Sequence, residues 1–489
     1  MIAVGAVQLL ILLLGLARAK FLSVSLGPAG YGLVSTIDQL VLALISLGAI
    51  GLPFAGLKFM ARAHSEGQES FERTYVGFLW ALASLGVLTA ATGITLAVFT
   101  PEIFGRELAG YSPLLALAML GIPAAMVNIL VANALAAAQR GTTSALVTLG
   151  IQGALFATTV AGVLAAGPRG LYIATATGGL LVTVVTVASL RRSLGSPAYG
   201  SLRWLRSAVR RENKILAYSA WIYLATAGYA VSLSGLRTSV FSHLGATSAG
   251  LLQAALGLAL TMGAVINPIS NLILTPYLNR TIATPEKVSS ANQFASRVLT
   301  LLFFAALPLV LFPRLVISVL FAPEFLPAAG ILFAFILWQC LAQFVNVYTQ
   351  LLIGLDDVGF ACGTMALSYG TVFLLAPLTT ARFGLQGAAG ALIIGSTLGG
   401  VTNLVRLKER FGAHLERRVA ARLTFTIGMI AAGVAVSFAS EERSSRGVML
   451  RAAVAVLCIA AQWVLLDNGE RDWVRSRFRG LGLSRNAAN

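Results

Sequence analysis

The stretch ARAKFLSVSLGPAGYG, residues 17–32, ends one long apolar run and leads into another. It contains two cations, Arg18 and Lys20, and closes in a short turn rich in Gly and Pro. Ionisable side chains inside apolar spans are costly and by default mark function. A related stretch, GLRTSVFSHLGATSAG at residues 235–250, carries Arg237 at nearly the same distance before its own turn. We therefore expect two copies of one membrane-embedded element.

The composition indicates a polytopic membrane protein. The chain has 489 residues, of which 57% are hydrophobic and 11% charged, whereas soluble domains carry about 25% charged residues. Apolar runs long enough to cross a bilayer follow one another through the chain. We predict an all-α integral membrane protein with about fourteen transmembrane helices. The expected spans are 1–25, 33–57, 74–99, 112–138, 142–166, 170–190, 215–243, 250–278, 296–321, 328–353, 359–381, 385–405, 422–440 and 448–466.

The cations are distributed unevenly between the two sides of these spans. When cations at the edge of a span are counted with the adjoining link, 25 of the 35 Lys and Arg residues belong to even-numbered links and the C-terminal tail, six to odd-numbered links, and four lie deeper inside spans. Because cytoplasmic loops collect Lys and Arg, this bias predicts a cell-membrane protein with both termini in the cytoplasm. It also explains the net charge of +17 without a nucleic-acid partner.

The chain repeats itself at a period of about 218 residues. Five pairs of segments match in order across both halves: 26–32 with 244–250, 48–57 with 263–272, 99–104 with 321–326, 124–141 with 342–359, and 167–178 with 384–395. Two parallel six-helix repeats follow, related by a pseudo-two-fold axis along the membrane normal. Such two-lobed proteins carry substrate in the cleft between the lobes.

The expected domains follow from this repeat. They are an N-terminal lobe at 1–195, a basic cytoplasmic linker at 196–213, a C-terminal lobe at 214–410, transmembrane helices 13 and 14 within 422–466, and a basic cytoplasmic tail at 467–489.

These features together resemble the polysaccharide and oligosaccharide flippases, in the superfamily that also holds multidrug-extruding and lipid II flippases. The residues that carry the resemblance are Leu26, Gly27, Pro28, Tyr31 and Gly32 after span 1, with Arg18 before them and Pro53 in span 2. The resemblance implies that a lipid-linked oligosaccharide of the polyprenyl pyrophosphate type crosses from the cytoplasmic to the outer leaflet by alternating access. It implies export of cell-surface polysaccharide, with membrane lipid, a polysaccharide polymerase and glycosyltransferases as further partners.

Three charged residues lie at a similar depth in spans 1 and 2. Arg18 lies about 12 Å below the outer turn, Lys20 about 9 Å and Asp38 about 10 Å. Arg18 therefore has two possible roles: it lines the cleft as an anion ligand, or it is neutralised by Asp38. Lys20 either lines the cleft or extends its side chain to the outer surface. Asp38 is a candidate for an ion pair or for ion coupling.

Arg237 is the strongest candidate for a substrate ligand. At the repeat position of Asp38 the chain has the apolar Leu256, so no local acid is expected to neutralise Arg237. A planar guanidinium binds two oxygens of a phosphate. Arg314 lies at similar depth in span 9, with a cleft role and an outward-facing role equally open. We predict a cationic cavity formed by Arg237, Arg18, Lys20 and Arg314.

Two further pairs match in the repeat. Asn128 and Asn346 either line the cleft or hydrogen-bond between helices. Pro53 and Pro268 are expected to kink spans 2 and 8. We expect no cofactor and no metal, because no GxxxxGK[ST] motif occurs and no His has a metal-ligand neighbour at useful spacing.

Two other functions remain open. A multidrug or small-molecule antiporter of the same superfamily would be favoured by twelve spans and by buried acids for ion coupling, whereas fourteen expected spans and a single buried acid, Asp38, near cations argue against it. A membrane glycosyltransferase or polymer ligase would need catalytic carboxylates or His in a sizeable outer loop. The outer links are short and their acids form no paired site, so we expect a protein that is not an enzyme, with no catalytic residue.

Overall fold

The protein is described by a computed structural model that covers residues 2–138, 140–194, 213–270, 274–278, 283–439, 442, 444–466 and 471. Within these ranges the chain is almost wholly helical and contains no strand. Ten helices in this part of the chain are long and apolar enough to cross a membrane. The all-α, multi-pass membrane class is therefore confirmed, whereas the count of fourteen spans stays a prediction.

The elements follow one another without a sheet layer. In chain order they are α1 (Ile2–Gly48), α2 (Leu52–Glu66), α3 (Gln68–Phe99), η1 (Pro101–Phe104), α4 (Arg106–Ala109), α5 (Ser112–Met119), α6 (Ile122–Ala137), α7 (Gly141–Leu194), α9 (Asn213–Ile269), α10 (Thr275–Leu278), α11 (Thr284–Leu311), α12 (Pro313–Leu320), η3 (Pro323–Ala328), α13 (Ala329–Gly354), α14 (Val358–Phe411), α15 (Arg417–Ala439) and α16 (Ser445–Leu465).

Four of these helices are interrupted by a glycine. A straight helix of the 47 residues of α1 would span about 70 Å, twice the hydrocarbon core. The interrupting residues have a positive φ, which an L side chain rarely adopts. They are Gly27 in α1 (φ 62°), Gly167 in α7 (φ 57°), Gly245 in α9 (φ 83°) and Gly384 in α14 (φ 60°).

At these glycines the helix folds back, so that two arms pack against each other. In α7, a Cβ added at Gly170 would overlap the carbonyl oxygen of Gly162, and one added at Gly178 would overlap the side chain of Thr158. The contacts join residues on opposite sides of the interruption, as antiparallel arms require. In α1, Arg18 pairs with Asp38 across Gly27, and in α14 a Cβ added at Gly387 would overlap the carbonyl oxygen of Thr379 across Gly384. These elements are helical hairpins, and α9, interrupted at the corresponding Gly245, is described in the same way.

The interruptions fall at matching positions of the predicted repeat. Gly27 corresponds to Gly245 in the matched segments 26–32 and 244–250, and Gly167 corresponds to Gly384. The matched segments at 99–104 and 321–326 both contain a 3₁₀ helix, η1 and η3. These coincidences agree with an internal repeat, which stays a prediction for the architecture as a whole.

Some predicted spans are divided where the sequence suggested continuity. The kink expected at Pro53 is a break: α1 ends at Gly48, Ile50 and Gly51 have positive φ, and Pro53 lies in the first turn of α2. The proline ring is well placed there, because the first helical N–H groups need no intrahelical acceptor. Span 4 is divided into α5 and α6 around Gly121, and span 9 into α11 and α12 at Phe312.

The predicted basic linker and the predicted basic tail lie largely outside the residues that the structure describes. The linker at 196–213 falls on undescribed residues except for Asn213, and so does the tail at 467–489 except for Arg471. Of Pro268 the structure gives the backbone only, and α9 ends one residue later, at Ile269.

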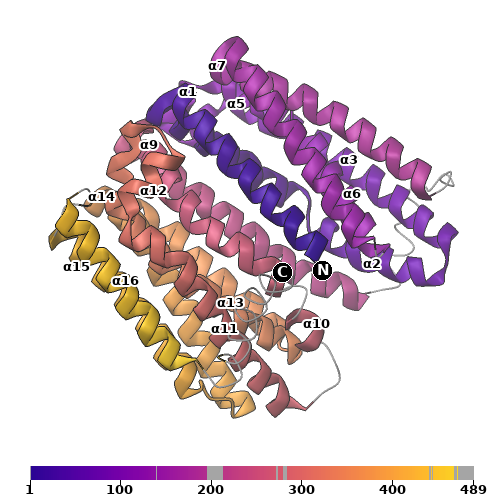
Figure 1. Cartoon of the computed structure of the whole chain (residues 1–489). Coiled ribbons are helices and arrows are strands. Elements are labelled where there is room, and N and C mark those ends of the chain that lie inside the picture. The colour runs from indigo at the N-terminus through magenta and orange to yellow at the C-terminus, as the bar shows by residue number, and fades with distance from the viewer. Residues whose placement is uncertain are drawn as a thin grey trace, which may run out of the picture.

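The N-terminal and C-terminal halves lie side by side. In Figure 1 the helices up to α7 occupy one side of the bundle and those from α11 the other, while α1 and α9 run next to each other between them. The helices α15 and α16 lie at the far edge of the C-terminal side. The contact between α1 and α9 is thus the surface along which the halves meet.

Candidate functional site

The interface between the halves is closed at the end where the hairpins of α1 and α9 turn. A Cβ added at Gly32 would overlap the carbonyl oxygen of Ala246, and one added at Gly250 would overlap the carbonyl oxygen of Pro28. Two backbones approach this closely only where both residues lack a side chain. We call the contact of Gly32 and Gly250 the glycine crossing and this end of the molecule the hairpin end.

Aromatic rings seal the same end beside the glycine crossing. The ring of Tyr31 lies 5.7 Å from that of Phe325 and 6.3 Å from that of Phe321, both from the C-terminal half. On the other flank, the rings of Tyr111 and Phe241 are 6.3 Å apart in an edge-to-face arrangement. These pairs join the halves by apolar contact, which separation of the halves would break.

Arg237 lies in this interface, below the glycine crossing. Its side chain belongs to α9, and its Nη1 donates to Oε1 of Gln39 at 2.7 Å and to the carbonyl oxygen of Ser35 at 3.3 Å, both on α1. The residue is 7% exposed. Its hydrogen-bond partners therefore come from the opposite half rather than from the adjacent span, and the role of Arg237 as a substrate ligand stays a prediction.

These partners are all neutral. Within the described part of the chain no carboxylate forms an ion pair with Arg237, and its Nε has no hydrogen-bond acceptor. A buried guanidinium without a counter-ion is expensive and needs every donor satisfied. The closed interface thus holds a positive charge that would interact more favourably with water or an anion.

Arg18 is paired inside the N-terminal half. Its Nη2 lies 3.3 Å from Oδ2 of Asp38, its Nε donates to Oγ1 of Thr159, and the hydroxyl of Tyr172 lies 3.1 Å from Oδ1 of Asp38. Of the two roles left open for Arg18, the structure shows the second: Asp38 neutralises its charge. Both side chains of the pair remain 36% exposed, so an anion ligand role for Arg18 stays a prediction.

Lys20 points to the opposite half. Its Nζ donates to the carbonyl oxygen of Val319 at the end of α12. This contact joins α1 to the C-terminal half at the hairpin end and uses the charge of Lys20 to satisfy a helix carbonyl. A role of Lys20 in binding substrate stays a prediction.

Arg314 lies apart from the other three cations. It is the second residue of α12 and lines a groove formed with α13, α14, α15 and α16. The single cationic cavity predicted from the sequence is therefore not gathered in this conformation: three cations lie at or near the interface of the halves, and Arg314 lies in a groove of the C-terminal half.

The two predicted asparagines have different surroundings. Oδ1 of Asn128 accepts from the hydroxyl of Thr183 at 3.2 Å and lies 3.5 Å from that of Thr186, so Asn128 joins α6 to α7. Asn346 lines a cavity of about 90 Å³ inside the C-terminal half, with polar groups that include Ser232, Thr364 and Asn403. Asn128 thus hydrogen-bonds between helices, whereas Asn346 lines a small cavity within the C-terminal half, and a role of either in the cleft between the lobes stays a prediction.

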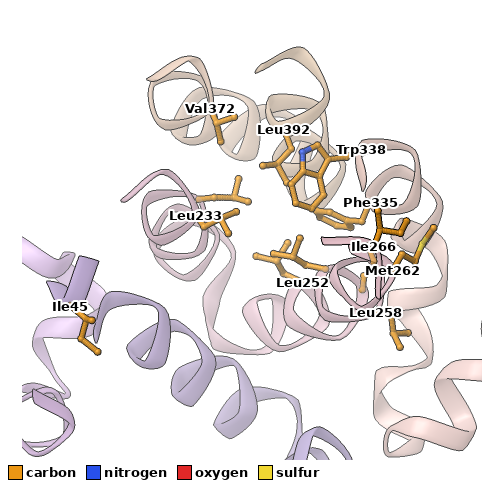
Figure 2. Close-up of a cluster of buried hydrophobic side chains, with 14 of the residues drawn as sticks. Ile45, Leu233, Leu252, Leu258, Met262, Ile266, Phe335, Trp338, Val372 and Leu392 are labelled. Carbon is orange, nitrogen blue, oxygen red and sulfur yellow. The ribbon is translucent and has the colours of Figure 1, made fainter. Parts of the chain in front are cut away.

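Apolar side chains form the rest of the wall of this small cavity. Figure 2 shows Leu233, Trp338, Val372 and Leu392 directed toward one another from α9, α13 and both arms of α14. No group of three His, Cys, Asp or Glu that could hold a metal ion occurs among the described residues. The cavity is too small for a sugar and is a polar gap between helices.

Sequence reasoning missed two functional neighbours, Gln39 and Tyr172. Gln39 follows Asp38 directly and faces the other half, a position that only the hairpin geometry reveals. Tyr172 lies in α7 after its glycine turn, and its proximity to Asp38 depends on how α7 packs on α1. Neither position carries a local sequence signal.

No protein-family model matches the chain, and no curated protein matches it. Solved structures match over nearly the whole chain. The lipid II flippase MurJ in an inward closed conformation is 12% identical, with a TM-score of 0.70 over 97% of this chain and 99% of that one. An inward-facing multidrug resistance MATE family transporter of the MOP superfamily is 15% identical, with a TM-score of 0.61 over 86% of this chain and 99% of that one.

A third match is a MOP superfamily transporter from Pyrococcus furiosus, described as having a binding pocket of reverse polarity. It is 15% identical, with a TM-score of 0.58 over 83% of this chain and 95% of that one. At such identities the likeness establishes the fold. The resemblance to this superfamily drawn from the sequence is confirmed at that level.

Proposed function

We propose that this chain flips a lipid-linked oligosaccharide across the cell membrane by alternating access, with two lobes at 1–195 and 214–410 that separate along the contact of α1 and α9. The fold is that of membrane transporters, including a lipid II flippase, whose named cargo is a lipid-linked precursor. Transport rather than enzymatic chemistry is also favoured by the other solved structures reported above.

The observation that carries the proposal is the buried charge of Arg237. An anion between the separated halves would replace two neutral acceptors with a full counter-charge, which a guanidinium prefers. A pyrophosphate group supplies that charge, so binding would favour the separated state. Arg18 and Lys20 lie on the adjacent arm of α1 and would extend the cationic surface.

The proposed direction of transport rests on the distribution of cations. The positive-inside bias places the hairpin end outside the cell and both termini in the cytoplasm. The state described here, sealed by the glycine crossing, is then closed to the outside. We further propose that a polysaccharide polymerase and glycosyltransferases act before or after this step.

Charge removal tests the proposal. Arg237→Gln and Arg18→Gln, reconstituted in vesicles, should each lower flipping of a polyprenyl pyrophosphate oligosaccharide by about tenfold or more, the effect of losing one charge-assisted hydrogen bond. Arg382→Gln is the matched control, since Arg382 is an exposed cation at the predicted outer side. Full flipping by both well-folded variants would refute a cationic pathway.

A multidrug antiporter is the second candidate. It is favoured by the structural match to multidrug transporters and by Asp38, a part-exposed acid contacted by Tyr172. An antiporter should move organic cations in exchange for protons or sodium ions when a gradient of those ions is imposed on the same vesicles, and Asp38→Asn should abolish that movement. Gradient-driven drug movement without oligosaccharide flipping would favour this candidate.

A further inference from the structure

A large cavity lies in the C-terminal half, lined by residues of α12 to α16. It is a groove of about 920 Å³ between α13 and α15, closed at one end by α12 and α16, and its volume lies within the range of ligand sites. Figure 1 shows α15 and α16 at the edge of the bundle, with α3 and α7 at the opposite edge. We call it the lateral groove. It is separate from the proposed substrate route.

Its walls are apolar along most of their length. Phe333 and Leu337 of α13 face Ile427, Ile430 and Val434 of α15. The helix α15 is apolar enough to cross a membrane. From Ile427 to Val434 it rises by about 10 Å, within the thickness of one leaflet of the hydrocarbon core. The chemistry of this wall suits a hydrocarbon chain.

The end of the groove nearest α12 is charged. Arg314 is exposed there, and within the described residues its guanidinium makes no hydrogen bond or ion pair. Glu442 lies beside it, but its carboxylate accepts the backbone N–H groups of Arg314 and Leu315 at 3.1 and 2.7 Å. Arg451 also lines this end and is buried. Glu442 is engaged by backbone N–H groups, so the exposed guanidinium of Arg314 is available as a cation at this end of the groove.

We propose that the lateral groove binds an anionic phospholipid, with its phosphate at Arg314 and one acyl chain between α13 and α15. The groove combines an apolar channel with a cation at one end, which is the complement of such a lipid. The charge bias of the links places Arg314 in the outer leaflet. The lipid would fill the space between α13 and α15 and so stabilise the position of α15 and α16.

Photolabelling tests the site in the full chain. The probe is phosphatidylglycerol with a photoreactive acyl chain, mixed into vesicles of phosphatidylethanolamine and phosphatidylglycerol at a ratio of about three to one, a membrane with anionic headgroups. Labelled peptides should come from α13 and α15. Arg314→Gln should lower this labelling by about tenfold, the effect of one lost charge-assisted contact, and Arg314→Lys should retain part of it.

Two controls separate charge from shape. Arg382→Gln removes another exposed cation at the predicted outer side, outside the groove lining, and should leave labelling unchanged. Ala431→Phe should fill the groove and lower labelling with no change of charge, whereas Ala435→Phe, one turn further along α15 and outside the lining, should not. These alanine variants also test the site if Arg314→Gln fails to fold.

Two results would overturn the proposal. One is equal labelling of α13 and α15 in the Arg314→Gln and Arg382→Gln proteins together with equal labelling in the two phenylalanine variants. The other is labelling of the groove by a photoreactive polyprenyl pyrophosphate but not by the phosphatidylglycerol probe, which would make the groove part of the substrate route.

Discussion

Nη1 of Arg237 and Oε1 of Gln39 lie 2.7 Å apart across the interface of the two halves. Gln39 is itself buried, and its Nε2 lies 3.4 Å from the carbonyl oxygen of Ala230. Gln39 therefore holds α9 by both ends of its amide. With no carboxylate paired to Arg237 in the described part of the chain, this amide is the strongest acceptor that the closed interface offers to the guanidinium.

Gln39→Leu should loosen the closed interface. The variant leaves Arg237 with the Ser35 carbonyl alone, at a cost of about 1.5–3 kcal/mol for a lost hydrogen bond to a charged group. The closed state should then lose about tenfold or more in population. The readout is the rate at which an aqueous thiol reagent labels a Thr36→Cys protein, since Thr36 is 1% exposed in the closed interface.

A second background shows whether the effect passes through Arg237. In an Arg237→Met protein, Gln39→Leu should change the labelling rate little, because no charge is left for the amide to satisfy. An equal rise in both backgrounds would mean that Gln39 acts by packing alone and would contradict the assigned role.

The sequence predicted the class of fold for a physical reason: hydrophobic runs, glycine turns and the cation bias are local properties of the chain. It also identified Arg18 and Asp38 as neighbours, because a tight turn fixes the antiparallel register of two adjacent arms. It did not reveal the partners of Arg237, because they come from a helix nearly two hundred positions away. It left the surroundings of Arg314 open, because residue depth in a membrane does not say which side of a helix bundle a residue faces.

The glycine crossing predicts a second effect. Gly32→Ala should force the hairpin turns of α1 and α9 apart, because the added Cβ would overlap the backbone of Ala246. Spin labels at Ala29 and Thr247, both exposed on the turns, should report a longer distance and a broader distribution by pulsed electron resonance. The transport rate should fall as this distance lengthens, because each transport cycle needs a state that is sealed at the hairpin end.

Gly257→Ala is the control for this prediction. It lies in the same arm of α9 as Gly250, but its added Cβ would meet only Nε2 of Gln253 at 3.6 Å, an ordinary contact. The distance between the labels should be that of the parent protein. If Gly32→Ala also left the distance unchanged, the two turns would not be held in contact by these glycines.

The ion pairs of Asp357 should make the stability of the protein depend on pH. Its carboxylate, at the corner between α13 and α14, pairs with Arg406 at 2.8 Å and Arg410 at 2.7 Å. Burial opposes its ionisation, but the hydrogen bonds and charges of these arginines outweigh burial and hold the pKa of Asp357 below its ordinary 3.8. The two ion pairs therefore contribute stability above about pH 4, and this contribution is lost as the pH falls through the lower folded-state pKa of Asp357.

Asp357→Asn should lower the free energy of unfolding by about 1–3 kcal/mol at neutral pH, since both arginines are partly exposed and solvent screens them. Thermal unfolding in detergent should show a lower Tm at pH 7, and the difference from the parent should shrink below about pH 4. Asp356→Asn is the neighbouring control, since Asp356 is exposed and has positive φ, which Asn tolerates. An equal loss in both variants would assign the effect to the turn rather than to the ion pairs.

The hydrogen bonds of Arg422 join α15 and α16 to the rest of the C-terminal half. It is 2% exposed. Its Nη2 donates to the carbonyl oxygen of Leu465, in the last turn of α16, at 2.8 Å, and its Nη1 donates to Oγ1 of Thr300 and to the carbonyl oxygen of Ser296 on α11 at 2.9 and 3.1 Å. One guanidinium thus joins three helices, and a cation at a helix C-terminus is favoured by the helix dipole.

Arg422→Met keeps the length of the side chain and removes these donors. It should lower the free energy of unfolding by about 3 kcal/mol, because the Leu465 carbonyl loses its buried donor and α11, α15 and α16 lose the guanidinium that joins them. The Tm in detergent should fall, and limited proteolysis should cut residues 412–416, between α14 and α15, faster. Arg417→Met, at the exposed start of the same helix, should leave both measurements unchanged. If the two variants behave alike, α15 and α16 are held by apolar packing against α11 and not by Arg422.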